Sequence, residues 1–203
     1  PGPRPRRMLD RRAQALVAPL LRRLAAGCVR IGLTADALTW TGFAIGIAAA
    51  AAIALQAPLL GLALIGVSRL CDGLDGAVAR LTHTTDRGAF LDIALDFLFY
   101  ASIPLAFAVA DPAANALASA VLLAAYIGTG SSFLAFAVFA QQRGLQSAAF
   151  PDKGLYYLGG LTEATETYVC YALMCLLPQH YAWWAYGFAA LCAITAGMRI
   201  AHG

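Results

Sequence analysis

The sequence predicts an all-α, polytopic membrane protein with six transmembrane helices and an N-terminal interfacial amphipathic helix. Of its 203 residues, 61% are hydrophobic and only 12% are charged, whereas soluble domains carry about 25% charged residues. Apolar runs of roughly 20 residues, the length that crosses a ~30 Å hydrocarbon core, recur along the chain. These runs lack the alternation of period two that is typical of membrane β-barrels. Composition and periodicity therefore exclude a soluble globule and favour a helical bundle.

The N-terminal segment is strongly basic. Eight of the 14 basic residues precede the first apolar run. From Met8 to about Cys28, leucines share one helical face and arginines another, which predicts an amphipathic helix on the inner leaflet. Because Lys and Arg favour the cytoplasmic side, we expect this end in the cytoplasm, at a membrane of the bacterial inner type. The chain then divides into an interfacial segment, residues 1–33, and a six-helix transmembrane domain, residues 34–203.

The apolar runs define six predicted spans. They cover about Ala35 to Leu55, Pro58 onward, Gly88 to Val109, Ala114 to Ala140, Leu155 to Leu177, and Tyr181 to Met198. The second helix differs from the others because it is apolar only as far as Ser68 and polar afterwards. A loop is expected from Gln141 to Lys153. Six crossings from a cytoplasmic start place the basic connecting residues on the inner side, as the positive-inside bias requires.

Carboxylates gather at the second and third predicted helices. Five of the 11 acidic residues fall between Asp72 and Asp96. Asp72 and Asp75 are three apart and Asp92 and Asp96 four apart, so each pair projects from one helical face. A short turn joins the two helices, which makes them antiparallel neighbours. A carboxylate at membrane depth costs at least a few kcal/mol unless it is compensated, which favours a functional role.

A cluster of this kind favours a hard divalent cation, because four convergent carboxylates repel one another. All donors are oxygens, which predicts Mg²⁺ or Mn²⁺ rather than zinc. Two ions about 3.5 to 4 Å apart would suit phosphoryl transfer. Gly76 would let the backbone approach a phosphate, and Arg80 would balance its charge. The alternative is an ionic network of Arg69, Arg80 and Arg87 that only holds the helices together.

Two stretches separated by seven residues form a motif: Asp72-Gly-Leu-Asp75-Gly76-Ala-Val-Ala79-Arg80 and Gly88-Ala-Phe-Leu-Asp92-Ile-Ala-Leu-Asp96. At every fixed position they resemble the signature D-x2-D-G-x2-A-R-x7,8-G-x3-D-x3-D of the CDP-alcohol phosphotransferase family. The predicted interfacial helix and six spans are also similar to the plan of that family. The resemblance implies transfer of a substituted phosphate from a CDP-linked donor to an alcohol, with release of CMP, in phospholipid synthesis.

The resemblance also implies roles for individual residues. Asp96 would act as general base toward the acceptor hydroxyl, and Gly76 and Arg80 would contact the nucleotide and diphosphate. Two divalent metal ions would be held on the diphosphate by the four motif aspartates, Asp72, Asp75, Asp92 and Asp96. The implied partners are membrane lipid, a donor such as CDP-diacylglycerol, an alcohol acceptor and a second copy of the chain in a homodimer, but no nucleic acid. The active site would face the cytoplasm.

The chain departs from the family just before the first span. There the family often shows T-P-N-x-L-T, and this chain has Thr34-Ala-Asp36-Ala-Leu-Thr39. An amide can donate to a phosphate or a base, whereas an ionised carboxylate cannot. Asp36 and Thr39 are candidate nucleotide-binding residues, and helix capping is an equal alternative for Asp36.

The remaining candidates concern the acceptor, whose identity the sequence leaves open. Glu163 and Glu166 lie within the fifth predicted span, where they would recognise a polyol or cationic acceptor, or pair with Arg69 or Arg87. Three basic residues at the cytoplasmic mouth would hold an acceptor phosphate, or lie there only through the positive-inside bias: Arg143, Lys153 and Arg199.

Two other functions are consistent with buried acids. An intramembrane prenyltransferase also binds a diphosphate through Asp and Mg²⁺, but it carries two Asp-rich motifs on distant helices, and a single split cluster occurs here. A cation transporter would distribute its acids through the bilayer depth, whereas these gather near one face. The pattern therefore favours the phosphotransferase.

Overall fold

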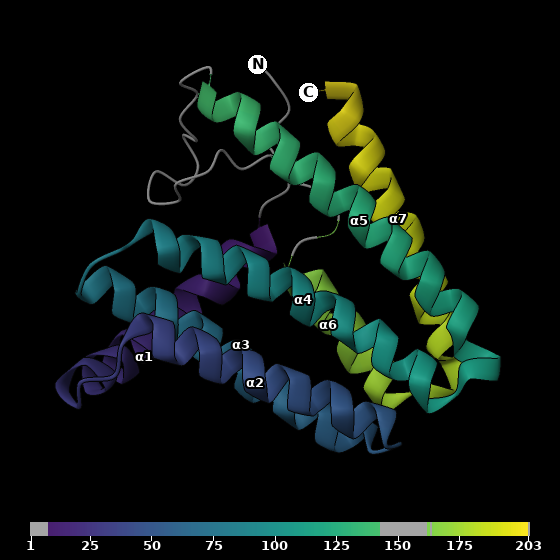
Figure 1. The fold of residues 1–203 in the computed structure, drawn as a ribbon, viewed down its shortest axis with the longest axis horizontal. Helices are drawn as coiled ribbons and strands as arrows, with labels where there is room; N and C mark the ends of the chain where they lie inside the picture. Colours follow the sequence, from purple (N-terminus) through teal and green to yellow (C-terminus); the bar gives the residue numbers. More distant parts are fainter. Residues whose placement is uncertain (1–7, 143–161, 163, 203) are drawn as a thin grey trace. The chain divides into compact units, whose positions relative to one another are not determined.

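The structure is a computed structural model that describes residues 8–142, 162 and 164–202, and each regular element in these ranges is a helix (Figure 1). The helices in chain order are α1 (Met8–Arg30), α2 (Ala35–Ala54), α3 (Pro58–Leu81), α4 (Asp86–Ala110), α5 (Pro112–Gln142), α6 (Ala164–Leu176), the short 3₁₀ helix η1 (Pro178–His180) and α7 (Tyr181–His202). The predicted all-α class is confirmed.

Most helices begin and end close to their predicted positions, and one boundary was wrong. Gln141 and Gln142 were expected to open a loop, but they are the last two residues of α5. Neither Gly nor Pro separates them from the preceding helix, and Gln is itself a good helix former, so the helix continues. Residues 143–161, which include most of the expected loop, lie outside the described part of the chain.

Four of the described helical segments are long and apolar enough to cross a membrane. They are Ala35–Ala54, Asp86–Ala110, Pro112–Phe139 and Pro178–Ala201. Of the two other predicted spans, α3 carries its charges within the helix, and the described part of α6 has 13 residues, or about 20 Å at 1.5 Å per residue. The coarse prediction of a helical membrane protein therefore holds, and six spans remain a prediction.

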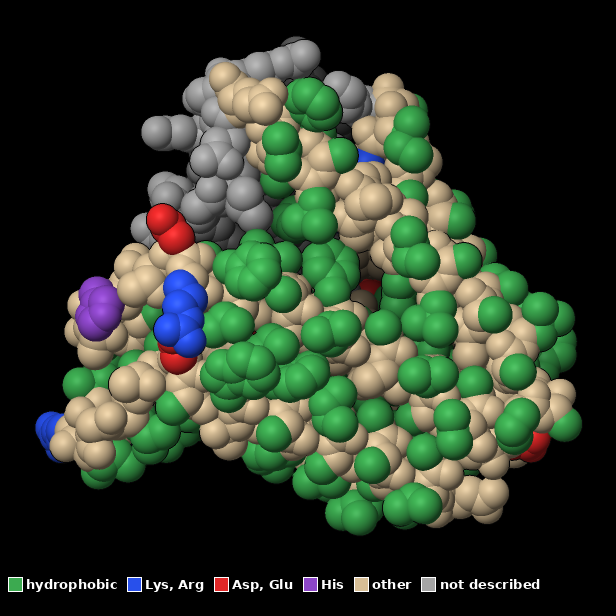
Figure 2. All heavy atoms as spheres, viewed as in Figure 1, with side chains coloured by type: hydrophobic (Ala, Val, Ile, Leu, Met, Phe, Trp, Pro, Cys, Tyr) green, Lys and Arg blue, Asp and Glu red, His purple; other side chains and the backbone are tan. Residues whose placement is uncertain are grey.

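The surface agrees with a lipid environment. Hydrophobic side chains are spread over the whole described part of the face seen in Figure 2, and charged side chains are few there. Large apolar residues are well exposed on the candidate spans: Leu105 is 56% exposed, Leu117 71% and Ile127 72%. Continuous apolar surface of this kind would be unfavourable in water and suits contact with acyl chains. The chain is an integral membrane protein.

Local sequence signals explain the helix ends. The hydroxyl of Thr34 accepts the Ala37 N–H at 3.2 Å, and that of Thr85 accepts the Gly88 N–H at 3.0 Å, which caps α2 and α4. Helices α3 and α5 begin with proline, which is favoured at the first helical position because its missing N–H needs no partner there. Helix α1 ends before Gly32, whose φ of 77° reverses the chain direction.

The first compact unit comprises residues 1–52 and 59–100. Helices α2, α3 and α4 meet in it at two glycines: a Cβ on Gly42 would lie 3.0 Å from Cys71 Cβ, and one on Gly46 would lie 2.6 Å from Phe99 Cδ2. The G-x-x-x-G spacing in α2 therefore serves packing within the chain. Helix α1 joins the same unit, because Ala25 is fully buried in a cluster with Leu74 and Val78 of α3.

The second compact unit comprises residues 53–58 and 101–203. Tyr181 of α7 stacks on Phe107 at a ring-centroid distance of 4.4 Å, and its hydroxyl lies 2.7 Å from that of Ser119 in α5. Helices α5 and α7 also approach at Gly128, where an added Cβ would lie 3.8 Å from that of Ala196. The predicted division of the chain into residues 1–33 and 34–203 differs from these two units and remains a prediction.

Candidate active site

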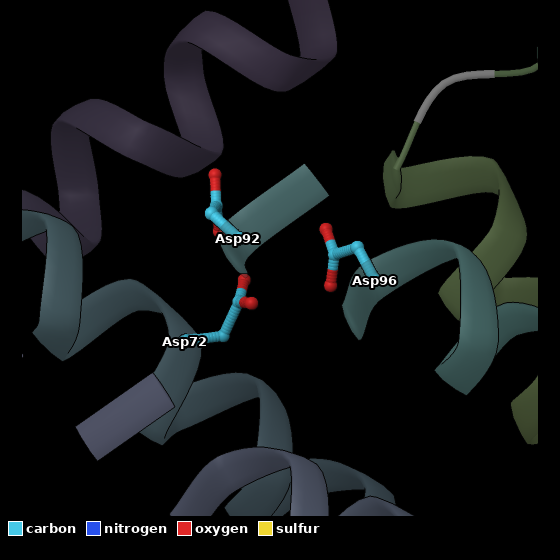
Figure 3. Close-up of side chains that lie close together, drawn as sticks. All are labelled: Asp72, Asp92 and Asp96. Carbon is cyan, nitrogen blue, oxygen red and sulfur yellow. The ribbon is translucent and has the colours of Figure 1, made fainter. Parts of the chain in front are cut away.

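Three carboxylates from two helices converge in the first unit. Asp72 lies in the polar half of α3, and Asp92 and Asp96 lie near the start of α4. Each offers one oxygen atom, and the three oxygens lie within 4.8 Å of one another (Figure 3). Residues 82–85 connect the two helices directly, so a short turn brings α4 back along α3. The predicted convergence of acidic side chains between these helices is therefore present for three of the four motif aspartates.

The fourth motif aspartate, Asp75, is turned toward α2. Its side chain is buried at 6% exposure, and its Oδ2 lies 2.6 Å from the hydroxyl oxygen of Thr39. The same hydroxyl lies 3.0 Å from the carbonyl oxygen of Ala35, and its single proton can be donated to one of these acceptors at a time. Thr39, predicted to contact the nucleotide, thus lies directly beside the acidic cluster.

Arg69 provides positive charge inside the cluster. Its Nη1 donates to Asp96 Oδ1 at 2.6 Å and lies 3.3 Å from Asp72 Oδ1. The guanidinium carbon lies 3.9 Å from the centre of the Phe99 ring, a geometry in which the ring face attracts the cation. The sequence offered a signal for this contact, since Arg69 and Asp72 are three residues apart on one helix. The alternative ionic network included Arg69 as a link between the helices, and the structure identifies Asp96 of α4 as its partner.

The cluster opens into a small recess. Helix α2 contributes Thr39, Gly42 and Phe43 to its wall, and α3 and α4 contribute Arg69, Leu95 and the three converging aspartates. Gly42 cannot be enlarged without displacing Cys71 or the Ser68 carbonyl oxygen, which would lie 3.2 Å from an added Cβ. Three carboxylates therefore line the recess, together with Gly42, where a larger residue would press against Cys71 and Ser68.

The donor set fits a hard divalent metal ion. The three converging ligands are all carboxylates, and oxygen donors of this type are the ones preferred by Mg²⁺ and Mn²⁺. Their mutual repulsion is relieved only partly by the unit charge of Arg69. Asp72, Asp92 and Asp96 are thus able to hold a cation together, with Asp75 adjacent on the same helix as Asp72.

Gly76 and Arg80, the predicted diphosphate contacts, lie one turn apart on α3. A Cβ on Gly76 would lie 3.2 Å from Arg80 Nη1, so the guanidinium folds back over the glycine. Arg80 itself is exposed. The absence of a side chain at residue 76 therefore leaves room for the arginine to rest along its own helix.

Asp36 pairs with Arg87 and does not cap α2. The capping hydroxyl of α2 belongs to Thr34, so the suggestion that Asp36 caps the helix was wrong. Asp36 lies in the first turn, and its Oδ2 is 3.7 Å from Nε of Arg87. This exposed ion pair links the start of α2 to the start of α4, and exposed pairs of this kind contribute little to stability.

Two of the five acceptor candidates, Glu166 and Arg199, belong to the described part of the chain. Arg143, Lys153 and Glu163 lie outside the described residues. Glu166 is half-buried in the first turn of α6. Arg199 of α7 is only 8% exposed, donates to the Thr129 carbonyl at 3.1 Å and lies 5.6 Å from the centre of the Phe133 ring. Arg199 is therefore an interior residue of the second unit.

Comparison with known proteins agrees with the motif. The family model described as CDP-alcohol phosphatidyltransferase matches residues 32–195. A protein of Escherichia coli strain K12 called inner membrane protein YnjF is 50% identical over 200 residues, which cover 97% of this chain and 95% of the relative. Similarity at this level extends well beyond the 25 residues of the motif.

Solved structures show the same fold. Mycobacterium tuberculosis phosphatidylinositol phosphate synthase (PgsA1) with CDP-DAG bound superposes with a TM-score of 0.71 at 21% identity, covering 90% of this chain and 92% of that chain. The same enzyme in complex with manganese and citrate gives a TM-score of 0.70 at 20% identity, covering 89% and 87%.

The matched region contains the whole aspartate motif and the described helices from α2 onward, apart from the last residues of α7. The family match also favours phosphotransfer over the prenyltransferase and the cation transporter considered above. The chain therefore belongs to the CDP-alcohol phosphatidyltransferase family and is a transferase of substituted phosphate groups.

Proposed function

We propose that this chain transfers a phosphatidyl group from CDP-diacylglycerol to an alcohol acceptor and releases CMP, as a step of phospholipid synthesis. The observation that carries the proposal is the convergence of Asp72, Asp92 and Asp96 within 4.8 Å at the family motif. The similarity in fold to a synthase solved with CDP-DAG bound supports the choice of donor.

The four motif aspartates are the proposed ligands of two divalent ions, Mg²⁺ or Mn²⁺. Asp72, Asp92 and Asp96 have the geometry to share one ion, and Asp75 would reach a second by releasing its hydrogen bond to Thr39. A structural neighbour solved with manganese supports this choice of metal. When bound, the ions would supply the positive charge that stabilises the diphosphate during transfer.

The residues of the chain would act on the reacting atoms as follows. Asp96 accepts the proton of the acceptor hydroxyl. The acceptor oxygen forms a bond to the phosphatidyl phosphorus, the bond from that phosphorus to the bridging oxygen of CMP breaks, and CMP leaves with the electron pair. Arg80 lies against the diphosphate, and the missing side chain at Gly76 lets the helix backbone approach the same group. Asp36 and Thr39 are the proposed contacts to the nucleotide.

The proposed acceptor is a polyol phosphate of the inositol phosphate class, because the structural neighbours are named as phosphatidylinositol phosphate synthases. Its phosphate would be held by Arg143 and Lys153, and its hydroxyls by Glu163 and Glu166, whereas Arg199 is buried against Thr129 and is not assigned to the acceptor. The site would open at the cytoplasmic leaflet, where the basic N-terminal segment is expected.

A homodimer is also proposed. Its interface would not involve Gly42 and Gly46, because both glycines contact other helices of the same chain.

The test is a transfer assay on the purified full chain in lipid nanodiscs. Labelled CDP-diacylglycerol is supplied with Mg²⁺ or Mn²⁺ and a panel of glycerol phosphate, inositol phosphate, serine and free inositol. We expect CMP release and a labelled lipid product with one acceptor, and loss of both on adding EDTA. Asp96→Asn should slow transfer by about 10²- to 10⁴-fold, the range for a lost general base.

Two results would contradict the proposal. CMP formation at the wild-type rate by Asp96→Asn would remove the assigned base. Failure of every alcohol to receive the phosphatidyl group, while the protein remains folded and retains Mn²⁺, would remove the proposed donor.

A further inference from the structure

We infer that Arg69 is a positioning residue that controls metal loading: its guanidinium competes with the divalent cation for the oxygens of Asp72 and Asp96. The inference rests on the proposed function, because it assumes that these aspartates bind metal. It adds a residue that lies outside the motif, three positions before Asp72.

The guanidinium lies where a cation is expected. A single nitrogen, Nη1, is 2.6 Å from Asp96 Oδ1 and 3.3 Å from Asp72 Oδ1. These two carboxylates belong to different helices and are both members of the three-oxygen cluster. Arg69 thus joins α3 to α4 through two of the carboxylates that a metal ion would also use.

The arginine is anchored by side chains of α3 and α4, and Ser68 connects it to α2. Its Nη2 donates to Ser68 Oγ at 3.2 Å, while that hydroxyl donates its own proton to the Gly42 carbonyl of α2 at 2.7 Å. Phe99 of α4 lies beneath the guanidinium, with the ring centre 3.9 Å away. The Arg69 side chain is only 12% exposed. Such an arrangement holds the charge in place, unlike the mobile arginines of an exposed surface.

The charge of Arg69 affects both the stability of the metal-free protein and its affinity for metal. Without metal, the Arg69 guanidinium lies against Asp72 and Asp96 and lowers the repulsion that would push α3 and α4 apart. A divalent ion entering the cluster is repelled by the same guanidinium and competes with it for the Asp96 carboxylate. Arg69 should therefore stabilise the metal-free protein and weaken its affinity for metal.

The experiment measures Mn²⁺ affinity, not catalysis. Free Mn²⁺ is titrated by electron paramagnetic resonance against the full chain in detergent, for the wild type, Arg69→Gln and Arg69→Lys. Loss of a unit positive charge this close to the ligands should tighten Mn²⁺ binding at least about tenfold in Arg69→Gln, since neighbouring charges at this range shift ionic equilibria by one or more powers of ten. Arg69→Lys keeps the charge and should stay within about threefold of the wild type.

Thermal unfolding separates this role from a purely structural one. Without metal, Arg69→Gln should unfold at a lower temperature than the wild type, and saturating Mn²⁺ should raise its Tm by more than it raises that of the wild type. Equal or weaker Mn²⁺ affinity in Arg69→Gln would overturn the inference. So would equal tightening in Arg69→Lys, because the charge would then be irrelevant.

A measurement on the wild type covers the case in which Arg69→Gln does not fold. With ¹⁵N-labelled arginine, the guanidinium resonance of Arg69 is identified by its absence from the spectrum of Arg69→Lys. Saturating Mg²⁺ should shift that resonance, and an unchanged resonance would overturn the inference.

Asp72→Asn distinguishes the two proposals. If this variant loses Mn²⁺ binding while the wild type and Arg69→Gln bind equally, the metal site stands and the Arg69 inference fails. If the wild type itself binds no Mn²⁺, both fail.

Discussion

The two compact units stabilise their helix contacts with different polar groups. In the first, Arg69 joins α3 to α4 by a charged hydrogen bond of 2.6 Å to Asp96, beside two further carboxylates. In the second, hydroxyls pair with one another, Ser119 with Tyr181 at 2.7 Å and Tyr126 with Tyr171 at 3.0 Å. The buried Arg199 of this unit donates to a neutral carbonyl oxygen, that of Thr129, and not to a carboxylate. Both kinds of contact cross between different helices of the same unit.

The difference indicates which contacts serve chemistry. A neutral hydroxyl pair satisfies two buried groups at low desolvation cost and suits an apolar interior. Buried charges are expensive to desolvate, and replacing them with apolar residues is often neutral or stabilising. Charges kept in such a place are therefore better explained by function than by stability. Four predictions test this contrast between the units, from the largest expected effect to the smallest.

The largest effect is expected from removing one carboxylate charge in the first unit. Asp72→Asn should reduce phosphatidyl transfer by more than about 100-fold, because even the groups that support metal ligands contribute 10- to 100-fold. The matched control is Asp111→Asn in the second unit. Asp111 Oδ1 accepts the Ala114 N–H at 3.1 Å, and an Asn oxygen can accept the same bond. Comparable losses in both variants, measured as CMP release, would erase the distinction between the units.

A smaller effect is expected from the hydroxyl that holds Asp75. Thr39→Val keeps the branched shape but cannot donate to Asp75, and we expect about a tenfold loss of transfer, in the lower part of the range for groups supporting metal ligands. Thr39→Ser retains the hydroxyl and should stay close to the wild type. The measurement is kcat/KM at saturating Mg²⁺, and a loss that is equal in Val and Ser would show that the 2.6 Å hydrogen bond is not the cause.

The glycine contact between α2 and α4 should affect stability. In Gly46→Ala the new Cβ would lie 2.6 Å from Phe99 Cδ2, and Phe99 is fully buried, so we expect destabilisation of about 1 to 3 kcal/mol. Gly66 of α3 has no atom within 4 Å of an added Cβ. Gly66→Ala should therefore match or exceed the stability of the wild type, because alanine favours helix. Unfolding in detergent, followed by circular dichroism, compares the two.

The smallest effect is expected in the second unit. Tyr181→Phe retains the stacking on Phe107 but leaves the Ser119 hydroxyl, which is 1% exposed, without its tyrosine partner. The expected cost is about 1 kcal/mol in unfolding free energy, with transfer activity unchanged. Tyr186→Phe, at a side chain that is 43% exposed, should cost less. A large loss of activity in Tyr181→Phe would mean that neutral contacts also serve the reaction.

The aspartate motif shows how far local spacing can predict a site. Intervals of three and four residues placed each pair on one helical face, and the short connection made the helices neighbours, so Asp72, Asp92 and Asp96 meet as expected. The same spacing predicted that Asp75 would converge with these three aspartates. Its orientation depends on the Thr39 hydroxyl, which lies 36 residues away in the chain, and helical periodicity contains no information on such a contact.

The partners of Arg69 and Arg199 on other helices also could not be predicted from the sequence. Both follow apolar stretches, and hydropathy alone places each near a membrane boundary. Packing assigns Arg69 to Asp72 and Asp96, and Arg199 to the Thr129 carbonyl beside Phe133. The long flexible arginine side chain can reach partners on several helices, so its environment depends on how those helices cross.

The amino-acid sequence alone determined the helical class, the apolar segments and the identity of the motif. These follow from composition and from intervals of a few residues, over which backbone geometry is nearly invariant. Tertiary structure decided which carboxylates share a centre, which glycines lie against a neighbouring helix and which arginine enters the acidic cluster. Those outcomes depend on distances between side chains far apart in the chain, which only the packing of the helices sets.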